Sequence, residues 1–232
     1  MEKIVKKEYF LLALVKVKKS NRVLINSKLV TQFLFYGNIV YFTLLSVSIF
    51  FAIIFNLSSS NIWTHPVSDL GSSQFTPIPF MFDISCILAG TVIIPVYLSM
   101  KERLTYIIRS KHGKYGIIED KLSTYGSFMG VIGALGCILV GIFSFDRCGP
   151  NKLYHSILTG LAFGGLTFSI LLFSLYILIA DIHIPKVFGV YGLIAPLGFL
   201  LLWVLFELMV YEWLLLLSIV SFVIIYNLMV LK

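Results

Sequence analysis

Long apolar runs make up most of the chain, and short polar stretches separate them. A bilayer core about 30 Å thick is crossed by roughly 20 apolar residues in an α-helix. Six runs reach this length, and they are continuous rather than alternating, which favours helices over barrel strands. The predicted spans cover about residues 30–55, 77–100, 125–145, 153–180, 187–206 and 213–231. The pattern therefore predicts an all-α, polytopic membrane protein with a six-helix transmembrane domain over 30–232.

The composition agrees with a lipid environment. Of the 232 residues, 59% are hydrophobic and 12% are charged, whereas a soluble domain carries about a quarter of charged residues. The three cysteines, Cys86, Cys137 and Cys148, show neither a disulfide framework nor a metal-binding spacing. Cys86 and Cys137 fall inside apolar runs, where a thiol is typical of a small core residue.

The basic residues indicate the orientation of the spans. Only Arg147 and Lys152 fall on one side of the predicted membrane. The other sixteen fall on the opposite side: Lys3, Lys6, Lys7, Lys16, Lys18, Lys19, Arg22, Lys28, Lys101, Arg103, Arg109, Lys111, Lys114, Lys121, Lys186 and Lys232. This bias predicts insertion in the cytoplasmic (cell) membrane with both termini in the cytoplasm. The net charge of +7 is then an orientation signal that also attracts anionic lipid headgroups, and nucleic acid is not an expected partner.

The N-terminal segment, residues 1–29, forms a separate basic tail. Its FLLALV core has lysines on both sides and is too short for a span, and no small-residue cleavage site follows it. Two interpretations stay open: an interfacial helix on the inner leaflet, or a disordered tail.

The stretch HPVSDLGSS, residues 65–73, lies in a predicted outward-facing loop without Lys or Arg. Pro66 suits the first position of a short helix, Asp69 would lie near its first turn, and Gly71 would end it. This reading explains the stretch as a short interfacial helix over the bundle without any chemistry.

Further polar residues are predicted near the same outward side. Asp83 lies inside the second span, where a carboxylate is costly unless it faces the bundle interior or a water-filled cavity. Asp146 and Arg147 end the third span, and His155 opens the fourth. The candidate ligand-binding residues are His65, Ser68, Asp69, Asp83, Asp146, Arg147 and His155.

Two functions and one structural explanation fit this gathering of polar residues. The leading hypothesis is an outward-facing polar pocket that binds a lipid headgroup or small ligand without catalysis, with Arg147 as an anion partner. The first alternative is a metal-dependent lipid hydrolase, with zinc held by His65, Asp83 and His155. A structural explanation competes with both, in which Asp83 accepts hydrogen bonds from His65 or the serines and fastens the loop as a polar plug. The sequence leaves open whether the protein is an enzyme.

Small residues form stripes on two predicted helices. The third span carries Gly126, Gly130, Gly133, Cys137 and Gly141, and the fourth carries the GxxxG pair Gly160 and Gly164. Small residues let helices approach closely in lipid, so these two spans are expected to pack tightly. A contact with a second copy or with a larger membrane complex, in which this chain is an accessory subunit, is the other interpretation.

The motifs together resemble a known family. HPVSDLGSS, then GxxxGxxGALGCILVGIFSFD, then a histidine opening the next span, are similar to the domain-of-unknown-function 998 family, a distant relative of the Frag, DRAM and Sfk membrane proteins. Ser144 departs from the family pattern, which has proline there. The resemblance covers residues 30–180 and implies a six-helix bundle with both termini inside, and its relatives suggest lipid handling or sensing. The family's motif positions fall on His65, Pro66, Ser68, Asp69, Gly71, Gly141, Phe143, Asp146 and His155.

Overall fold

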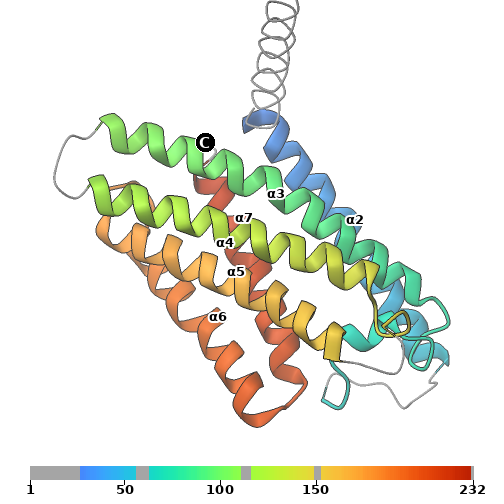
Figure 1. The fold of residues 1–232 in the computed structure, drawn as a ribbon. Helices are drawn as coiled ribbons and strands as arrows, with labels where there is room; N and C mark the ends of the chain where they lie inside the picture. Colours follow the sequence, from blue (N-terminus) through green and yellow to red (C-terminus); the bar gives the residue numbers. More distant parts are fainter. Residues whose placement is uncertain (1–26, 56–62, 111–115, 149–152, 231–232) are drawn as a thin grey trace, which may run out of the picture.

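The computed structural model describes residues 27–55, 63–110, 116–148 and 153–230, and these residues form helices joined by turns, with no strand among them. Figure 1 shows the helices as one bundle. In chain order they are α2 (Ser27–Phe55), the 3-10 helix η1 (Val67–Gly71), α3 (Pro79–Ser110), α4 (Gly116–Ile142), α5 (Leu153–Ile179), α6 (Lys186–Phe206) and α7 (Val210–Val230).

Six of these helices are long and apolar enough to cross a membrane, which confirms the predicted all-α fold with six spans. Two helices run beyond the predicted spans, because charged residues continue the helix outside its apolar part: α3 reaches Ser110 and α4 begins at Gly116. The basic tail, residues 1–29, falls almost entirely outside the described residues, so its conformation stays a prediction.

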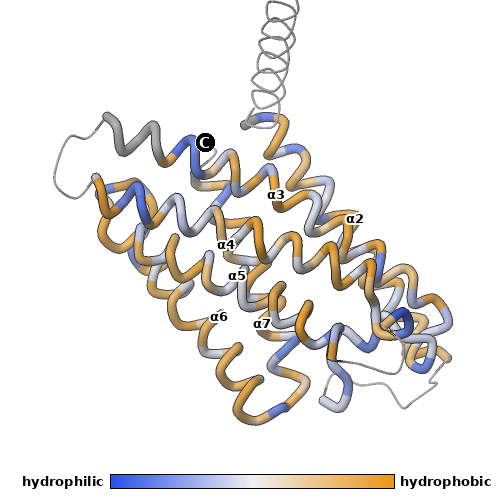
Figure 2. Tube along the Cα trace, in the orientation of Figure 1, coloured by the Kyte–Doolittle hydropathy of each residue, from blue (hydrophilic) through white to orange (hydrophobic). Residues whose placement is uncertain are grey.

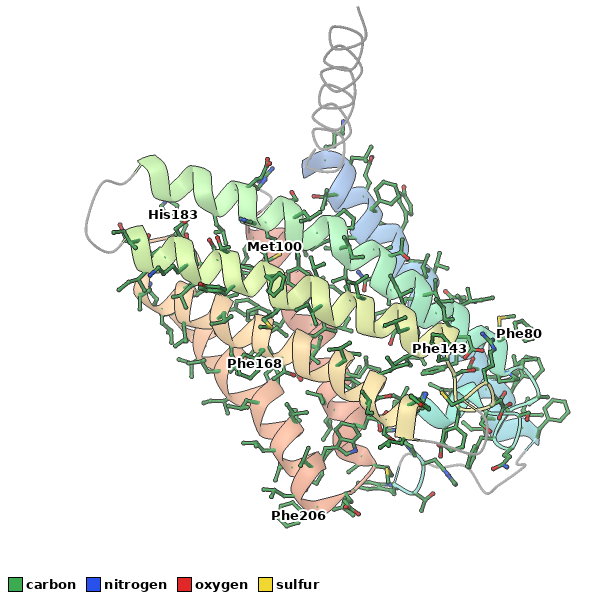
Figure 3. All side chains as sticks on the ribbon, viewed as in Figure 1. Phe80, Met100, Phe143, Phe168, His183 and Phe206 are labelled. Atoms are coloured by element: carbon green, nitrogen blue, oxygen red, sulfur yellow. The ribbon has the colours of Figure 1, made fainter. Side chains whose placement is uncertain are left out.

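The bundle has two distinct ends. At one end, called the η1 end below, α3, α5 and α7 begin, and η1 lies against the start of α3. At the opposite end α3 and α5 end, and α4 and α6 begin. Figure 3 places Phe80 and Phe143 at the η1 end and His183 at the opposite end. Each long helix packs against the next one in the chain, and α7 also contacts α5, α3 and α2.

The outer surface of the bundle is apolar. Figure 2 shows hydrophobic residues along the middle of the helices and hydrophilic residues mainly towards their ends. Large apolar side chains such as Phe168 and Phe206 are more than half exposed and project away from the helices (Figure 3). Exposed apolar area on this scale is typical of a surface that contacts lipid.

Glycines set the close packing of α4 against both neighbours. A Cβ on Gly133 would lie 2.6 Å from the backbone nitrogen of Leu166 on α5, and a Cβ on Gly141 would lie 2.4 Å from the carbonyl oxygen of Asp83 on α3. The expected tight packing of the third and fourth spans is therefore confirmed. The GxxxG pair does not provide it, because Gly160 and Gly164 have no described neighbour within 4 Å of such a Cβ.

Aromatic rings fill the half of the bundle nearer the opposite end. Phe173 stacks on Tyr97 with ring centroids 6.0 Å apart and lies 5.3 Å from Tyr226. Phe222 continues the series between Tyr226 and Phe188, at 5.6 and 4.7 Å. The rings come from α3, α5, α6 and α7, so these four helices share a dense aromatic layer.

Candidate functional site

The HPVSDLGSS stretch forms the predicted short helix, but this helix begins at Val67 rather than at Pro66. Pro66 precedes η1 in an extended conformation, Asp69 lies in its first turn, and Gly71 is its last residue. His65 Nδ1 lies 3.2 Å from Asp69 Oδ2, and Trp213 on α7 donates its indole N–H to the carbonyl oxygen of His65 at 3.1 Å. The loop is thereby fastened to the start of α7.

Asp83 forms an ion pair with Arg147, the residue that follows Asp146 beyond the end of α4. Asp83 is only 3% exposed. Its backbone contacts Gly141, whose missing side chain lets α4 pack closely against α3 at this point. Arg147 also donates to the carbonyl oxygens of Gly141 and Ile142 at 3.3 and 3.2 Å. The guanidinium thus caps the last carbonyls of α4 while it neutralises the buried acid of α3.

Asp146 holds the loop after η1. Its carboxylate accepts hydrogen bonds from Ser72 Oγ at 2.9 Å and from the Ser73 backbone N–H at 2.7 Å. Partial burial would raise the pKa of Asp146, but the hydrogen bonds from Ser73 and Ser72, and then the charge of Arg147, outweigh burial and lower that pKa below its ordinary value of 3.8. The contact therefore favours the ionised acid.

His155 lies in the first turn of α5 and is 4% exposed. Its Nδ1 lies 3.2 Å from the carbonyl oxygen of Phe143. Because a carbonyl only accepts, Nδ1 carries the proton in this contact. The ring meets that of Phe145 edge-on at 5.8 Å, and its buried Nε2 has no hydrogen-bond partner.

The predicted site residues thus lie at one end of the bundle, in separate contacts. These are His65 with Asp69, Asp83 with Arg147, Asp146 with Ser72 and Ser73, and His155 with a carbonyl. Within the described ranges, no three His, Cys, Asp or Glu side chains are grouped as metal ligands. These contacts join the loop and the helix ends, as the polar-plug interpretation expects, but the predicted partners of Asp83 are wrong: Asp83 pairs with Arg147, while Ser72 binds Asp146 and His65 contacts Asp69.

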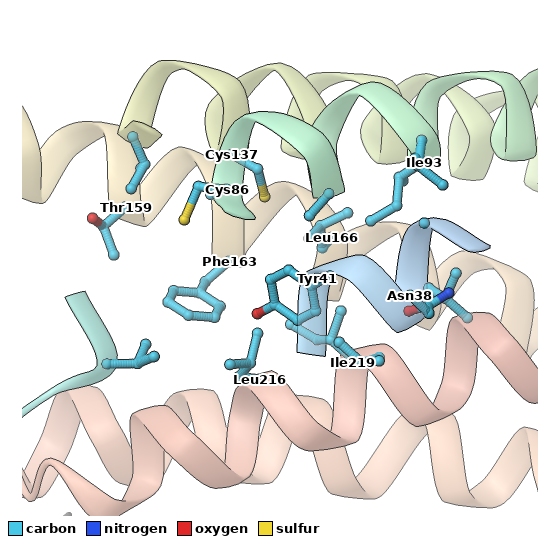
Figure 4. A pocket seen from close by; sticks show the side chains of 18 of the residues that line it. Asn38, Tyr41, Cys86, Ile93, Cys137, Thr159, Phe163, Leu166, Leu216 and Ile219 are labelled. Carbon is cyan, nitrogen blue, oxygen red and sulfur yellow. The ribbon is translucent and has the colours of Figure 1, made fainter. Parts of the chain in front are cut away.

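A cavity that was not predicted from the sequence lies inside the bundle, beneath η1. Side chains from α2, α3, α4, α5, α7 and η1 line it, and its volume with the open mouth is about 940 Å³. Figure 4 shows Thr159 towards one end, Asn38 and Ile93 towards the other, and Tyr41 and Leu216 between them. Along α7 the lining runs from Glu212 to Ile224, which is about 18 Å of helix. The cavity is therefore elongated along the bundle axis.

The cavity wall is largely apolar, and three of its polar residues lie near the η1 end. Glu212 is in the first turn of α7 and 1% exposed, Thr159 is in the second turn of α5, and Ser68 is in η1. The backbone N–H of Ser68 lies 3.4 Å from Glu212 Oε1, and the buried Thr159 Oγ1 has no hydrogen-bond partner. Ser68 is the one predicted site residue that lines the cavity.

Sequence reasoning missed Glu212 as a site residue for a definable reason. The predicted last span begins at 213, which leaves Glu212 in the preceding loop. The structure begins α7 at Val210, so Glu212 belongs to the helix and its side chain faces the interior. The available signal was the acid beside an apolar run, because buried intramembrane acids are costly and commonly functional.

Comparisons of the chain with protein-family models, with curated proteins and with solved structures gave no match. The resemblance to the domain-of-unknown-function 998 family therefore stays a prediction from the quoted motifs.

Proposed function

We propose that this chain is an integral membrane protein that binds a lipid or another small amphiphile, without a chemical step, in the cavity beneath η1. The proposal keeps the ligand class predicted from the sequence and moves the binding site from the polar loop to the cavity. Ser68 is common to both, and the loop contacts of Asp83, Asp146 and His155 serve to close the η1 end of the site.

The observation that supports the proposal is the cavity itself, elongated, lined mostly by apolar side chains, and polar towards one end. An empty apolar cavity forfeits the dispersion contacts of its lining. An alkyl chain would restore those contacts, while its polar head would lie near Ser68, Thr159 and Glu212.

A cavity-filling substitution tests the proposal. Leu216 lines the cavity, whereas its neighbour Leu217 is 53% exposed on the outer surface of α7. Leu216→Trp should lower the amount of amphiphile that co-purifies with the protein about tenfold, because overfilling a packed site costs about 1–3 kcal/mol. Leu217→Trp, the matched control, should retain the wild-type amount.

The measurement is quantitative mass spectrometry of amphiphiles extracted from the purified protein, normalised to protein and paired with a thermal unfolding curve for each variant. Equal amounts in the wild type and in both tryptophan variants would contradict binding in this cavity. So would a wild-type protein that carries no amphiphile and binds none when alkyl-chain compounds are added.

A further inference from the structure

The polar end of the cavity contains an acid that pairs with no cation among the described residues. Glu212 is 1% exposed, and its carboxylate accepts a hydrogen bond from the backbone N–H of Ser68 at 3.4 Å. The Ser68 hydroxyl and the Val67 backbone N–H are its other hydrogen-bond donors. No Lys or Arg among the described residues forms an ion pair with it. Buried carboxylates are normally paired with a cation, whereas the partners of Glu212 among the described residues are neutral donors of η1.

The charges around Glu212 do not supply that partner. Asp69 acts on Glu212 electrostatically with the same sign, and His65 Nδ1 lies 3.2 Å from Asp69 Oδ2. Arg147 is engaged by Asp83 and by the carbonyl oxygens at the end of α4. The described residues therefore give this end of the cavity an acidic character.

An unsatisfied hydroxyl lies in the same wall. Thr159 Oγ1 is buried and has no hydrogen-bond partner, and Thr159 lines the cavity together with Glu212 and Ser68. A hydroxyl both donates and accepts, and a carboxylate only accepts. The polar end thus offers acceptors to a group that carries several N–H donors and a positive charge. The apolar wall of the cavity continues from there along about 18 Å of α7.

We propose that the cavity selects a cationic amphiphile, an alkyl chain that ends in a primary ammonium, with the ammonium against Glu212 and the chain along the apolar wall. This inference rests on the proposed function and adds the class of ligand to it. An ammonium has three donors, which match Glu212, Thr159 Oγ1 and one further acceptor of the wall. A carboxylate head would place like charges together in a buried site, which costs several kcal/mol.

The test compares three probes that share one chain: tritiated dodecylamine, dodecanol and dodecanoate. Binding to the full-length protein in phosphatidylcholine nanodiscs is measured by scintillation proximity at pH 7. The variants are Glu212→Gln and the matched Glu207→Gln, whose acid is exposed at the turn between α6 and α7. For each probe, the binding to a variant is divided by the binding to the wild type, because the probe partitions into the bilayer equally in both samples.

Dodecylamine should bind the wild type at least about thirtyfold more tightly than Glu212→Gln, the loss expected when a buried charge pair is truncated. Dodecanol should bind both proteins equally, and Glu207→Gln should behave as the wild type does with every probe. Glu212→Asp, which keeps the charge, should retain a preference for the amine and serves in place of the Gln variant if that protein does not fold.

Two outcomes separate the inference from the proposed function. Equal binding of amine and alcohol to the wild type and Glu212→Gln would overturn the choice of a cation and leave an apolar binding site. Failure of all three probes to bind would overturn both. Phosphatidylethanolamine added to the nanodiscs distinguishes the sources of the ammonium: displacement of dodecylamine supports the inference with an aminophospholipid as ligand, and undisturbed binding supports it with a free single-chain amine.

Discussion

At the scale of single residues, the polar side chains of the η1 end act mainly through the partners they neutralise. Asp83 is almost fully buried and Arg147 is half exposed, so the arginine brings its charge to the acid without a full desolvation cost of its own. The pair adds little net stability of its own, but loss of the arginine would be strongly destabilising, because it would leave a buried carboxylate without a counter-charge. The same pair also fixes where the chain turns after α4, which positions Asp146 next to the loop.

Acid should weaken the attachment of the loop to α4 through Asp146. The pKa of Asp146 is lowered in the folded protein from its ordinary value of 3.8, so the ionised acid stabilises the fold. This contribution is fully present above pH 3.8 and is lost as the pH falls from there through the lowered pKa of the folded state. The thermal unfolding temperature of the purified protein should therefore fall below about pH 4.

The control is Asp146→Asn, which keeps the size of the side chain and removes its titration. This variant should unfold at a lower temperature than the wild type at pH 7 and should lose part of the acid dependence seen below pH 4. Identical acid profiles for the two proteins would show that Asp146 does not contribute through its ionised form.

Individual site contacts were harder to predict than the gathering of polar residues at one end. The spacing of Pro66, Asp69 and Gly71 was enough to predict η1, because each acts on its own neighbours in the chain. The ion pair of Asp83 with Arg147 joins residues 64 positions apart, and the bond of Ser72 to Asp146 joins residues 74 apart. Such partners depend on how the helices pack, which hydropathy alone does not specify.

At the scale of helices, length and apolar character predicted all six spans, and polar flanks obscured their ends. The apolar run is set by the thickness of the bilayer, but the helix continues as long as its backbone hydrogen bonds are favourable. Thus α4 begins at Gly116 rather than near 125, and α7 begins at Val210 rather than at 213. The second difference had a consequence, since it moved Glu212 from a loop into the cavity wall.

The glycines of α4 and α5 should differ sharply in their tolerance of alanine. A Cβ on Gly133 would lie 2.6 Å from the backbone nitrogen of Leu166, whereas one on Gly160 meets nothing described within 4 Å. Gly133→Ala should destabilise the protein by about 1–3 kcal/mol, because two helix backbones must separate. Gly160→Ala should be neutral or stabilising by up to about 1 kcal/mol, since alanine favours a helix.

Reversible unfolding in mixed micelles, followed by circular dichroism, measures both changes. If Gly133→Ala were as stable as the wild type, the close α4–α5 contact would be contradicted. If Gly160→Ala were the destabilised variant, the exposed glycines of α5 would have a partner beyond this chain, as the predicted contact with a second copy or a larger complex requires.

At the scale of the whole molecule, the cavity is the feature that sequence reasoning could not reach. Its wall combines residues from five long helices and from η1, and no one helix shows it as a pattern. The dense aromatic layer formed by Phe173, Phe222 and Tyr226 fills one half of the bundle, and smaller lining residues such as Ala89 and Ala162 leave space in the other. Whether small side chains from different helices meet and leave a cavity depends on how the helices pack, which the sequence of one helix does not specify.

The orientation in the membrane is also a property of the whole molecule, and the distribution of Lys and Arg predicts it. With sixteen basic residues on one side and two on the other, the η1 end should face outwards. Cys148 tests this directly, because it is a half-buried thiol at the η1 end. A membrane-impermeant maleimide should label Cys148 in intact cells that express a Cys86→Ser/Cys137→Ser protein, in which no other cysteine remains.

The matched control places a thiol at the opposite end. His183 is exposed in the turn between α5 and α6, so His183→Cys in a protein without other cysteines should react only after the cells are permeabilised. Charged loops rarely cross the bilayer against a strong basic bias. In intact cells, therefore, the maleimide should label either Cys148 or His183→Cys, but not both. Labelling of His183→Cys in intact cells, with Cys148 protected, would reverse the orientation and would place the acidic end of the cavity on the cytoplasmic side of the membrane.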